Sequence, residues 1–155
     1  CQDGLPAKML YLIDTNILLR LAKRNDPDRP IALKALQELK SRNEDLCYTT
    51  QVIVEFWNVC TRPLTARGGL GLTLEATERK ARLIEKQFRL LPESLATHQE
   101  WRRLVKLHNV KGVQVHDTML AAVMNVYGIT HLLTFNTPDF KRFGNLDVVS
   151  PADVI

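Results

Sequence analysis

The sequence predicts an α/β fold with three layers, α/β/α, in which helices cover both faces of a central, mostly parallel β-sheet. Two observations predict this fold class. Short apolar segments typical of buried strands alternate throughout with longer segments of helical periodicity. The 155 residues are 45% apolar and 25% charged, which is the composition of an ordinary globular domain. No repeat, low-complexity segment or long linker divides the chain.

The strands are expected where short apolar runs end in polar or turn residues. The clearest is Leu10–Ile13, which is followed by the polar residues Asp14, Thr15 and Asn16. These three residues form the exit of the strand and the cap of the next helix. Since the strands alternate with helices, a parallel sheet is expected. The expected strands are 10–13, 46–49, 88–91, 129–135 and 147–149, the last at an edge.

The helices are expected between these strands, and several have clear end signals. Pro30 suits the first position of a helix, Thr50 and Thr73 suit N-caps, and Gly128 suits the end of a helix. The expected helices are 17–23, 31–42, 51–61, about 74–86, about 95–108 and 115–127.

The chain length fits one domain, which we place at residues 9–155. Met9 is a candidate natural start, and residues 1–8 are then an upstream extension, either native or artificial. The sequence has no secretory-signal pattern and no apolar run near the ~18 residues of a membrane span. Cys47 and Cys60 lie in apolar settings and are expected to be buried hydrophobes. A reducing cytoplasmic location is consistent with them.

Three carboxylates, those of Asp14, Glu55 and Asp117, interrupt or close apolar segments. An ionised carboxylate among buried elements is costly unless it is paired or bound to a metal ion. Ligands of open parallel sheets bind beyond the carboxyl ends of the strands, and all three acids can face that edge. They predict one cation site and, with it, phosphodiester chemistry.

Each of these acids also has a structural alternative that the sequence leaves open. Asp14 and Asp117 could serve only as charges at helix N-termini. Glu55 could belong to a solvated helix face with Gln51 and Asn58, which lie four residues before it and three after it.

Three more polar residues lie at or beyond the end of the expected strand 129–135, namely Thr134, Asn136 and Asp139. They can reach the same edge of the sheet as the three acids. Asp139 follows Pro138 and could equally be a surface turn residue.

Charge and motifs narrow the possible functions. The net charge is +4, and it would be more positive without the acids of a metal site, which favours a polyanion such as nucleic acid. Charge alone fits a soluble protein without such a partner better. The glycines of 68–71 lack the following Gly-Lys-Ser/Thr of a phosphate-binding P-loop. The four histidines lack the spacing of a zinc site, and no Ser-centred nucleophile elbow is present.

At these residues the chain resembles the PIN-domain nucleases, especially the VapC-type toxins of bacteria and archaea. The matching stretches follow the family's order: Leu-Ile-Asp-Thr-Asn at 12–16, Val-Glu-Phe-Trp-Asn-Val at 54–59, His-Asp-Thr-Met-Leu-Ala-Ala at 116–122 and Leu-Thr-Phe-Asn-Thr-Pro-Asp-Phe at 133–140. The resemblance implies a three-layer fold, RNA cleavage that depends on Mg²⁺ or Mn²⁺, an antitoxin partner and frequent homodimers.

The resemblance also implies roles for individual residues. Its catalytic acids match Asp14, Glu55, Asp117 and, less closely, Asp139, of which the first three match metal-site positions. Asn16 and Thr134 match polar residues that support the acids. Asn136 stands where many members of the family have an aspartate, which puts a second metal ion in doubt.

The leading prediction is a metal-dependent endoribonuclease that acts as the toxin of a toxin–antitoxin pair. Two alternatives stay open: a housekeeping RNA-processing nuclease without an antitoxin, and a catalytically weak RNA-binding module of the same fold. Clustered carboxylates repel one another in the absence of metal. At least one of them is therefore expected to have a raised pKa.

Overall fold

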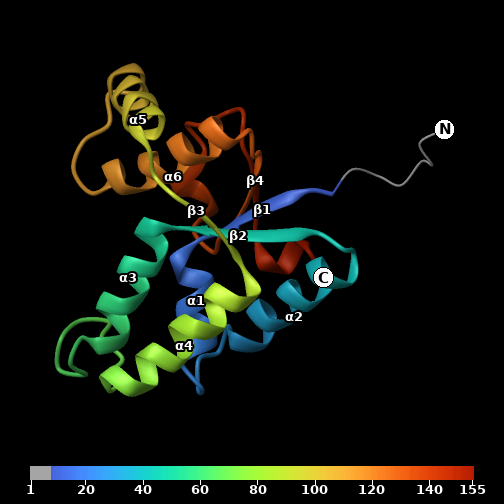
Figure 1. Cartoon of the computed structure of the whole chain (residues 1–155), viewed down its shortest axis with the longest axis vertical. Helices are drawn as coiled ribbons and strands as arrows, with labels where there is room; N and C mark the ends of the chain where they lie inside the picture. Colours follow the sequence, from blue (N-terminus) through green and yellow to red (C-terminus); the bar gives the residue numbers. More distant parts are fainter. Residues whose placement is uncertain (1–7) are drawn as a thin grey trace.

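Residues 8–155 are described by a computed structural model, and within them the chain forms a five-stranded, wholly parallel sheet (Figure 1). The order of the strands across the sheet is β3-β2-β1-β4-β5. The expected extension 1–8 lies outside the described residues except for Lys8. The strands are β1 (Leu10–Ile13), β2 (Asp45–Thr49), β3 (Arg89–Leu91), β4 (His131–Leu133) and β5 (Asp147–Val149).

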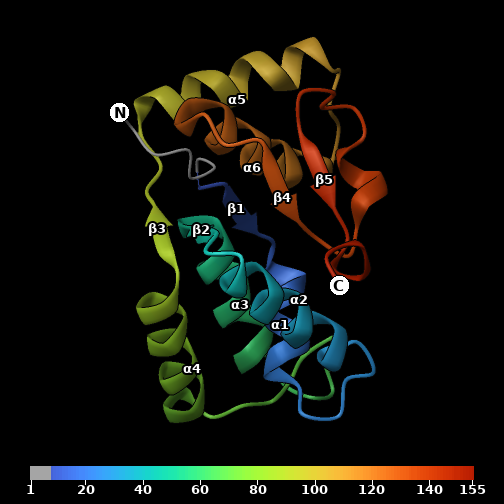
Figure 2. The same cartoon turned by 90° about the vertical axis from the view of Figure 1, so that its right-hand side faces the viewer.

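Helices cover both faces of the sheet, so the predicted three-layer α/β/α fold is confirmed (Figures 1 and 2). One layer contains α1 (Thr15–Ala22), α2 (Arg29–Ser41), α3 (Thr50–Thr61) and α4 (Leu74–Gln87). The other contains α5 (Leu95–Leu107) and α6 (Gln114–Tyr127). Two short 3₁₀ helices, η1 (Thr137–Phe140) and η2 (Pro151–Asp153), follow β4 and β5. None of the helices in residues 8–155 has both the length and the apolar character that crossing a membrane requires.

The path of the chain places a ligand-binding edge between β1 and β4. The chain runs outward from β1 through β2 to β3, then returns across the sheet to β4 on the other side of β1. Ligands of open α/β sheets bind at such a reversal, beyond the carboxyl ends of the strands. Ile13 pairs with Leu133 at these ends. Asp14 and Thr134, the next residue of each strand, therefore come together there.

The core lies between the sheet and its helical layers. Leu12 and Ile13 of β1 and Leu132 and Leu133 of β4 are fully buried. The apolar segment of α6 at 120–124 is also buried, which accounts for its almost unbroken apolar sequence. Removing this surface from water is the main force that holds the layers together.

The two described cysteines are buried, as expected. Cys47 and Cys60 have no exposed surface and are free thiols. Burial raises the pKa of the Cys47 thiol to about 12 and that of the Cys60 thiol to about 11. Both are therefore neutral and unreactive at ordinary pH.

Two helices begin earlier than predicted because of the residue that caps them. Thr50 was expected to cap α3, but the hydroxyl oxygen of Thr49 accepts the N–H of Val52 at 3.2 Å, and Thr50 is the first helical residue. Helix α1 begins at Thr15, whose N–H donates to the side chain of Asp14.

Strand β4 (131–133) is shorter than the predicted 129–135, and at its carboxyl end side chains bind the backbone that follows it. The side-chain oxygen of Asn16 accepts the N–H of Phe135, and the hydroxyl of Thr134 accepts the N–H of Asn136. The chain then enters η1, which was not predicted. The other element ends lie within one or two residues of the predicted ones, the usual uncertainty of such boundaries.

The cap of α3 gives a test of the fold. We expect Thr49→Ala to lower the free energy of unfolding by about 1 kcal/mol, the usual effect of losing an N-cap. Thr50 is exposed, so Thr50→Ala should change it by less than about 0.5 kcal/mol. Urea unfolding of both variants measures the difference. Equal losses would contradict the assignment of Thr49 as the cap.

Candidate active site

Asp14 lies at the carboxyl end of β1 and is 7% exposed. Its Oδ1 accepts the N–H of Thr15 at 2.7 Å. Its Oδ2 accepts the hydroxyl of Thr134 at 2.8 Å and the side-chain amide of Asn16 at 3.1 Å. Burial raises the pKa of Asp14, while the hydrogen bond from Thr134 is the strongest influence that lowers it. The side chain of Asp14 thus caps α1, which is the structural alternative stated for it above, and it also links the ends of β1 and β4.

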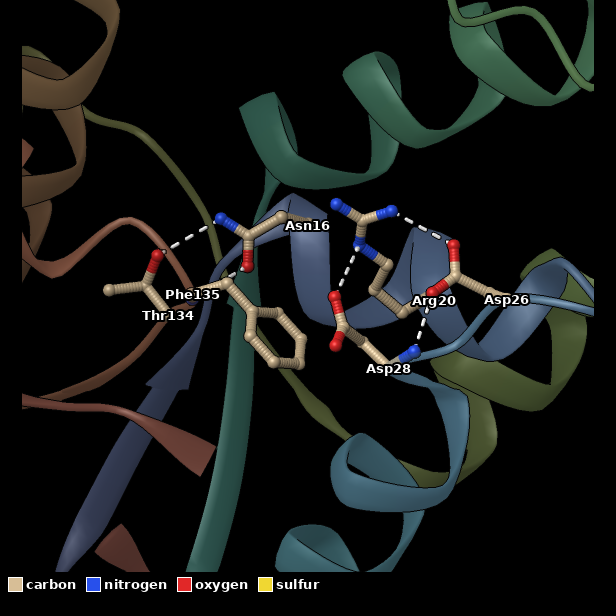
Figure 3. A network of polar contacts seen from close by, with 6 residues as sticks. All are labelled: Asn16, Arg20, Asp26, Asp28, Thr134 and Phe135. Atoms are coloured by element: carbon tan, nitrogen blue, oxygen red, sulfur yellow. Dashed lines mark hydrogen bonds and ion pairs between the residues drawn. The ribbon is translucent and has the colours of Figure 1, made fainter. Parts of the chain in front are cut away.

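Asn16 and Thr134 join α1 to the segment that follows β4 (Figure 3). The Asn16 amide also donates to the hydroxyl oxygen of Thr134 at 3.0 Å, and its carbonyl oxygen accepts the N–H of Phe135 at 3.1 Å. The Thr134 hydroxyl donates to Asp14 and accepts from Asn16 and from the N–H of Asn136, which uses its full hydrogen-bonding capacity. Asn136 enters this network through its backbone.

Glu55 extends from α3 toward the start of α1. Its Oε2 accepts the hydroxyl of Thr15 at 3.0 Å, and its Oε1 accepts the side-chain amide of Gln51 at 3.0 Å. Glu55 and Gln51 are half-buried, and of the three residues of the proposed solvated face only Asn58 is exposed. The interpretation of Glu55 as part of a solvated face is therefore wrong.

Asp117 and Asp139 complete the set of acids. Asp117 is half-buried in the first turn of α6, and Asp139 is exposed on η1. The pKa of Asp117 is raised to about 6, first by burial and then by the negative charges of Asp14, Asp139 and Glu55. The four predicted acids therefore lie within one another's electrostatic influence. The expected raised pKa is confirmed at both Asp117 and Asp14.

The residue types at this edge fit a divalent cation, because carboxylate oxygens are the ligands that Mg²⁺ prefers. In residues 8–155, however, no three His, Cys, Asp or Glu side chains are grouped so that they could already hold a metal ion. Carboxylates repel one another when no cation lies between them. A bound cation would therefore have to draw these side chains together.

The family model of the PIN domain matches residues 11–146 of the chain. The chain belongs to the PIN-domain family. Its members are nucleases. The matched segment begins in β1 and ends just before β5, so it includes all four acids. No curated protein matches the sequence closely enough to add to this assignment.

Solved structures of similar fold come from bacterial toxin–antitoxin systems. VapBC-1 of nontypeable Haemophilus influenzae has a TM-score of 0.66 at 20% identity, over 93% of this chain and 99% of that one. VapBC2 of Rickettsia felis, bound to promoter DNA, has a TM-score of 0.64 at 18% identity, over 92% and 98%. VapC20 of Mycobacterium tuberculosis, a toxin that cleaves the sarcin–ricin loop, has 0.63 at 19%, over 85% and 94%. At these identities the likeness shows a shared fold.

Two side chains of this PIN domain hold the acids and were not predicted to do so. The sequence predicts Thr15 only as part of a strand exit and helix cap, yet its hydroxyl reaches Glu55, 40 residues away in the sequence. The sequence predicts Gln51 only as a member of the alternative solvated face. Its position four residues before Glu55 places the two on one side of a helix, which is the signal that could have identified it.

An ion pair holds the far end of α1 (Figure 3). Arg20, one turn beyond Asn16, lies 2.9 Å from the carboxylate of Asp26 and 3.8 Å from that of Asp28. Asp26 is 5% exposed and also accepts the N–H of Asp28 at 2.9 Å. The turn between α1 and α2 is thereby fixed. Helix α1, which presents Asn16 to the acids, is thus held at both ends.

The raised pKa of Asp117 predicts a dependence of stability on pH. The pKa of about 6 lies above the ordinary 3.8, so the folded protein holds this proton more tightly than the unfolded chain does. The resulting loss of stability is absent below about pH 3.8, grows up to about pH 6 and is complete above that.

We expect Asp117→Asn, which cannot ionise, to melt at a higher temperature than the wild type in EDTA at about pH 8. The difference should shrink as the pH falls to about 4. Thermal melts across this range measure it. A difference that is independent of pH would show that ionised Asp117 does not destabilise the fold.

Proposed function

We propose that this PIN domain is an endoribonuclease that uses Mg²⁺ or Mn²⁺ and acts as the toxin of a toxin–antitoxin pair in the cytoplasm. The observation that carries the proposal is the convergence of charge at the β1–β4 edge. There, Asp14, Asp139 and Glu55 all raise the pKa of Asp117. A protein keeps such an unfavourable grouping where a cation compensates it. The PIN-domain family supports nuclease chemistry.

The proposed metal ligands are Asp14, Glu55 and Asp117. Each oxygen of a carboxylate can accept about two hydrogen bonds. Oδ2 of Asp14 already accepts two, whereas Oδ1 accepts one, so Oδ1 keeps capacity for a cation. Each oxygen of Glu55 likewise accepts one hydrogen bond. These donors thus orient the carboxylates of Asp14 and Glu55 and leave oxygen lone pairs available to a cation.

A divalent cation supplies activation of the attacking water and neutralisation of the charge that develops on the phosphate. The side chains of this chain have the complementary tasks of orienting the acids and admitting the RNA. Asp139 is exposed and acts on Asp117 through its charge, so we assign it a lesser catalytic role. Asn136, three residues before Asp139, has an amide in place of a carboxylate.

A nucleic acid is the substrate that the charge of the molecule supports. The chain carries a net charge of +4 although four of its acids gather at one edge, so the rest of the molecule is basic and attracts a polyanion. The choice of RNA over DNA draws on the family resemblance and on VapC20, a structural neighbour that cleaves the sarcin–ricin loop. Homodimer formation, implied by the same resemblance, stays a prediction.

An antitoxin segment has a suitable docking place in the apolar groove between α1, α2 and α4. Leu33 and Leu83 line the groove and are 37% and 56% exposed. Arg29, Lys40 and Lys80 also line it, and no acidic residue does. The occupant that these features fit is an amphipathic antitoxin segment that carries acidic side chains. The structural neighbours that are toxin–antitoxin complexes support such a partner.

Cleavage of RNA by the purified protein tests the proposed activity. With total RNA and Mg²⁺ or Mn²⁺, we expect endonucleolytic products that EDTA abolishes. Asp14→Asn should lower the rate about a hundredfold or more, because a metal ligand contributes several kcal/mol to transition-state stabilisation. Asp139→Asn should lower it less.

Two outcomes would change this assignment. Equal and complete loss in both variants would make Asp139 a full member of the metal site. No cleavage with either metal would favour an RNA-binding module of the same fold.

Bacterial growth tests the toxin role and the groove together. Expression of the wild type alone should arrest growth, Asp14→Asn should relieve the arrest, and co-expression of a candidate antitoxin encoded beside this protein should restore growth. Leu83→Asp should stay toxic despite the antitoxin, because acidic side chains of the partner would meet another negative charge. Leu95→Asp on α5, where Leu95 is 71% exposed, is the matched control and should be neutralised normally. Normal growth with soluble wild type would favour a housekeeping nuclease.

A further inference from the structure

Gln51 connects the two helices that carry Glu55 and Asp117. Its side-chain nitrogen donates to Oε1 of Glu55 at 3.0 Å and to the main-chain oxygen of His116 at 3.0 Å. His116 directly precedes Asp117, so one amide group contacts a proposed metal ligand and the backbone next to another. Both N–H groups of the amide are used. In the described part of the chain, no other hydrogen bond joins α3 to α6.

Little else fixes the spacing of α3 and α6 at this point. A cavity lies between Gln51 and Val54 of α3 and His116 and Met119 of α6, and Val54 is 60% exposed. Side chains that would pack the two helices against each other are therefore lacking beside Gln51. Gln51 and His116, which the hydrogen bond joins, both line this cavity.

The start of α6 also lacks a side-chain N-cap. Its N-cap residue, Val113, makes no side-chain hydrogen bond to the helix, and Gly112 before it has a positive φ of 64°. The indole N–H of Trp101 on α5 donates to the main-chain oxygen of Val115 at 2.9 Å. The first turn of α6 is thus held by Trp101 of α5, by Gln51 of α3 and by Arg142, whose side chain donates to that of Gln114.

The chemistry of the glutamine side chain suits a metal site. It is neutral, so it can orient a carboxylate without cancelling the charge that a cation needs. A lysine here would form an ion pair with Glu55 and compete with the cation, and a glutamate would repel the carboxylate of Glu55. An amide with two donors is the side chain that can hold Glu55 and the backbone of α6 together.

We propose that Gln51 is a positioning residue that sets the separation of Glu55 and Asp117 and thereby the affinity of the site for its cation. This inference rests on the proposed function. Groups that orient metal ligands typically contribute 10- to 100-fold to metal affinity or activity. Gln51 should therefore act on metal binding and on the catalytic rate without contacting the RNA.

Gln51→Met tests the proposal, because methionine keeps the length of the side chain and removes both donors. We expect Mn²⁺ affinity, measured by calorimetry, to fall about tenfold. The kcat for RNA cleavage should fall at subsaturating Mn²⁺, with little change in KM for RNA. Gln99→Met, at an exposed position of α5, is the matched control and should bind Mn²⁺ like the wild type.

A second variant separates positioning from folding. Gln51→Ala adds no bulk and places the best helix former in α3, so it should fold and show the same loss of Mn²⁺ affinity. If both Gln51 variants bind Mn²⁺ as tightly as the wild type while Asp117→Asn binds it weakly, the positioning role of Gln51 is overturned and the proposed metal site stands. A lower melting temperature in EDTA with unchanged affinity would also overturn it. No Mn²⁺ binding by the wild type would instead overturn the proposed function, and the positioning role with it.

Discussion

The hydrogen bond from Thr134 to Asp14 is the contact on which the proposed site depends. It joins the residues that follow β1 and β4, the neighbouring strands between which the chain reverses its direction across the sheet. The N–H of Asp14 also donates to the carbonyl of Leu133 at 3.0 Å. A buried carboxylate is tolerated there because donors from both strand ends surround it. Without this junction, α1 would have no fixed starting point at the edge of the sheet.

Glu55 and Asp117 are placed relative to that junction by side-chain contacts rather than by the sheet itself. Thr15 begins α1 and reaches Glu55, and Gln51 reaches both Glu55 and the first turn of α6. Asp117 follows at the next residue of that turn. Hydroxyl and amide groups thus form a continuous chain of contacts from β1 to α6. No lysine or arginine side chain takes part in these contacts, so none of them forms an ion pair with Glu55.

The fold could be predicted because its signals are local. The run Leu10–Ile13, the cap at Thr73 and the glycine at 128 each identify an element from adjacent residues. Asp14, Glu55 and Asp117 could be predicted as a set because each interrupts or closes an apolar segment. The contact of Glu55 with Thr15 could not be predicted, because it depends on how α1 and α3 pack. The short β4 escaped prediction for the same reason: the side chain that binds Phe135 comes from Asn16, 119 positions away.

The parallel sheet also determines at which end of the chain a tag or a surface tether lies away from the carboxylates. Because β1 is the central strand, Met9 lies at the amino ends of the strands, and its carbonyl accepts the N–H of Asp45 there. A purification tag or fluorophore joined ahead of Met9 therefore enters the domain at the edge opposite the carboxylates. Residue 154, by contrast, lies close to α2, because its carbonyl accepts a hydrogen bond from Arg42, the residue that follows this helix. An immobilised form in which the apolar groove between α1, α2 and α4 stays accessible is therefore better tethered ahead of Met9.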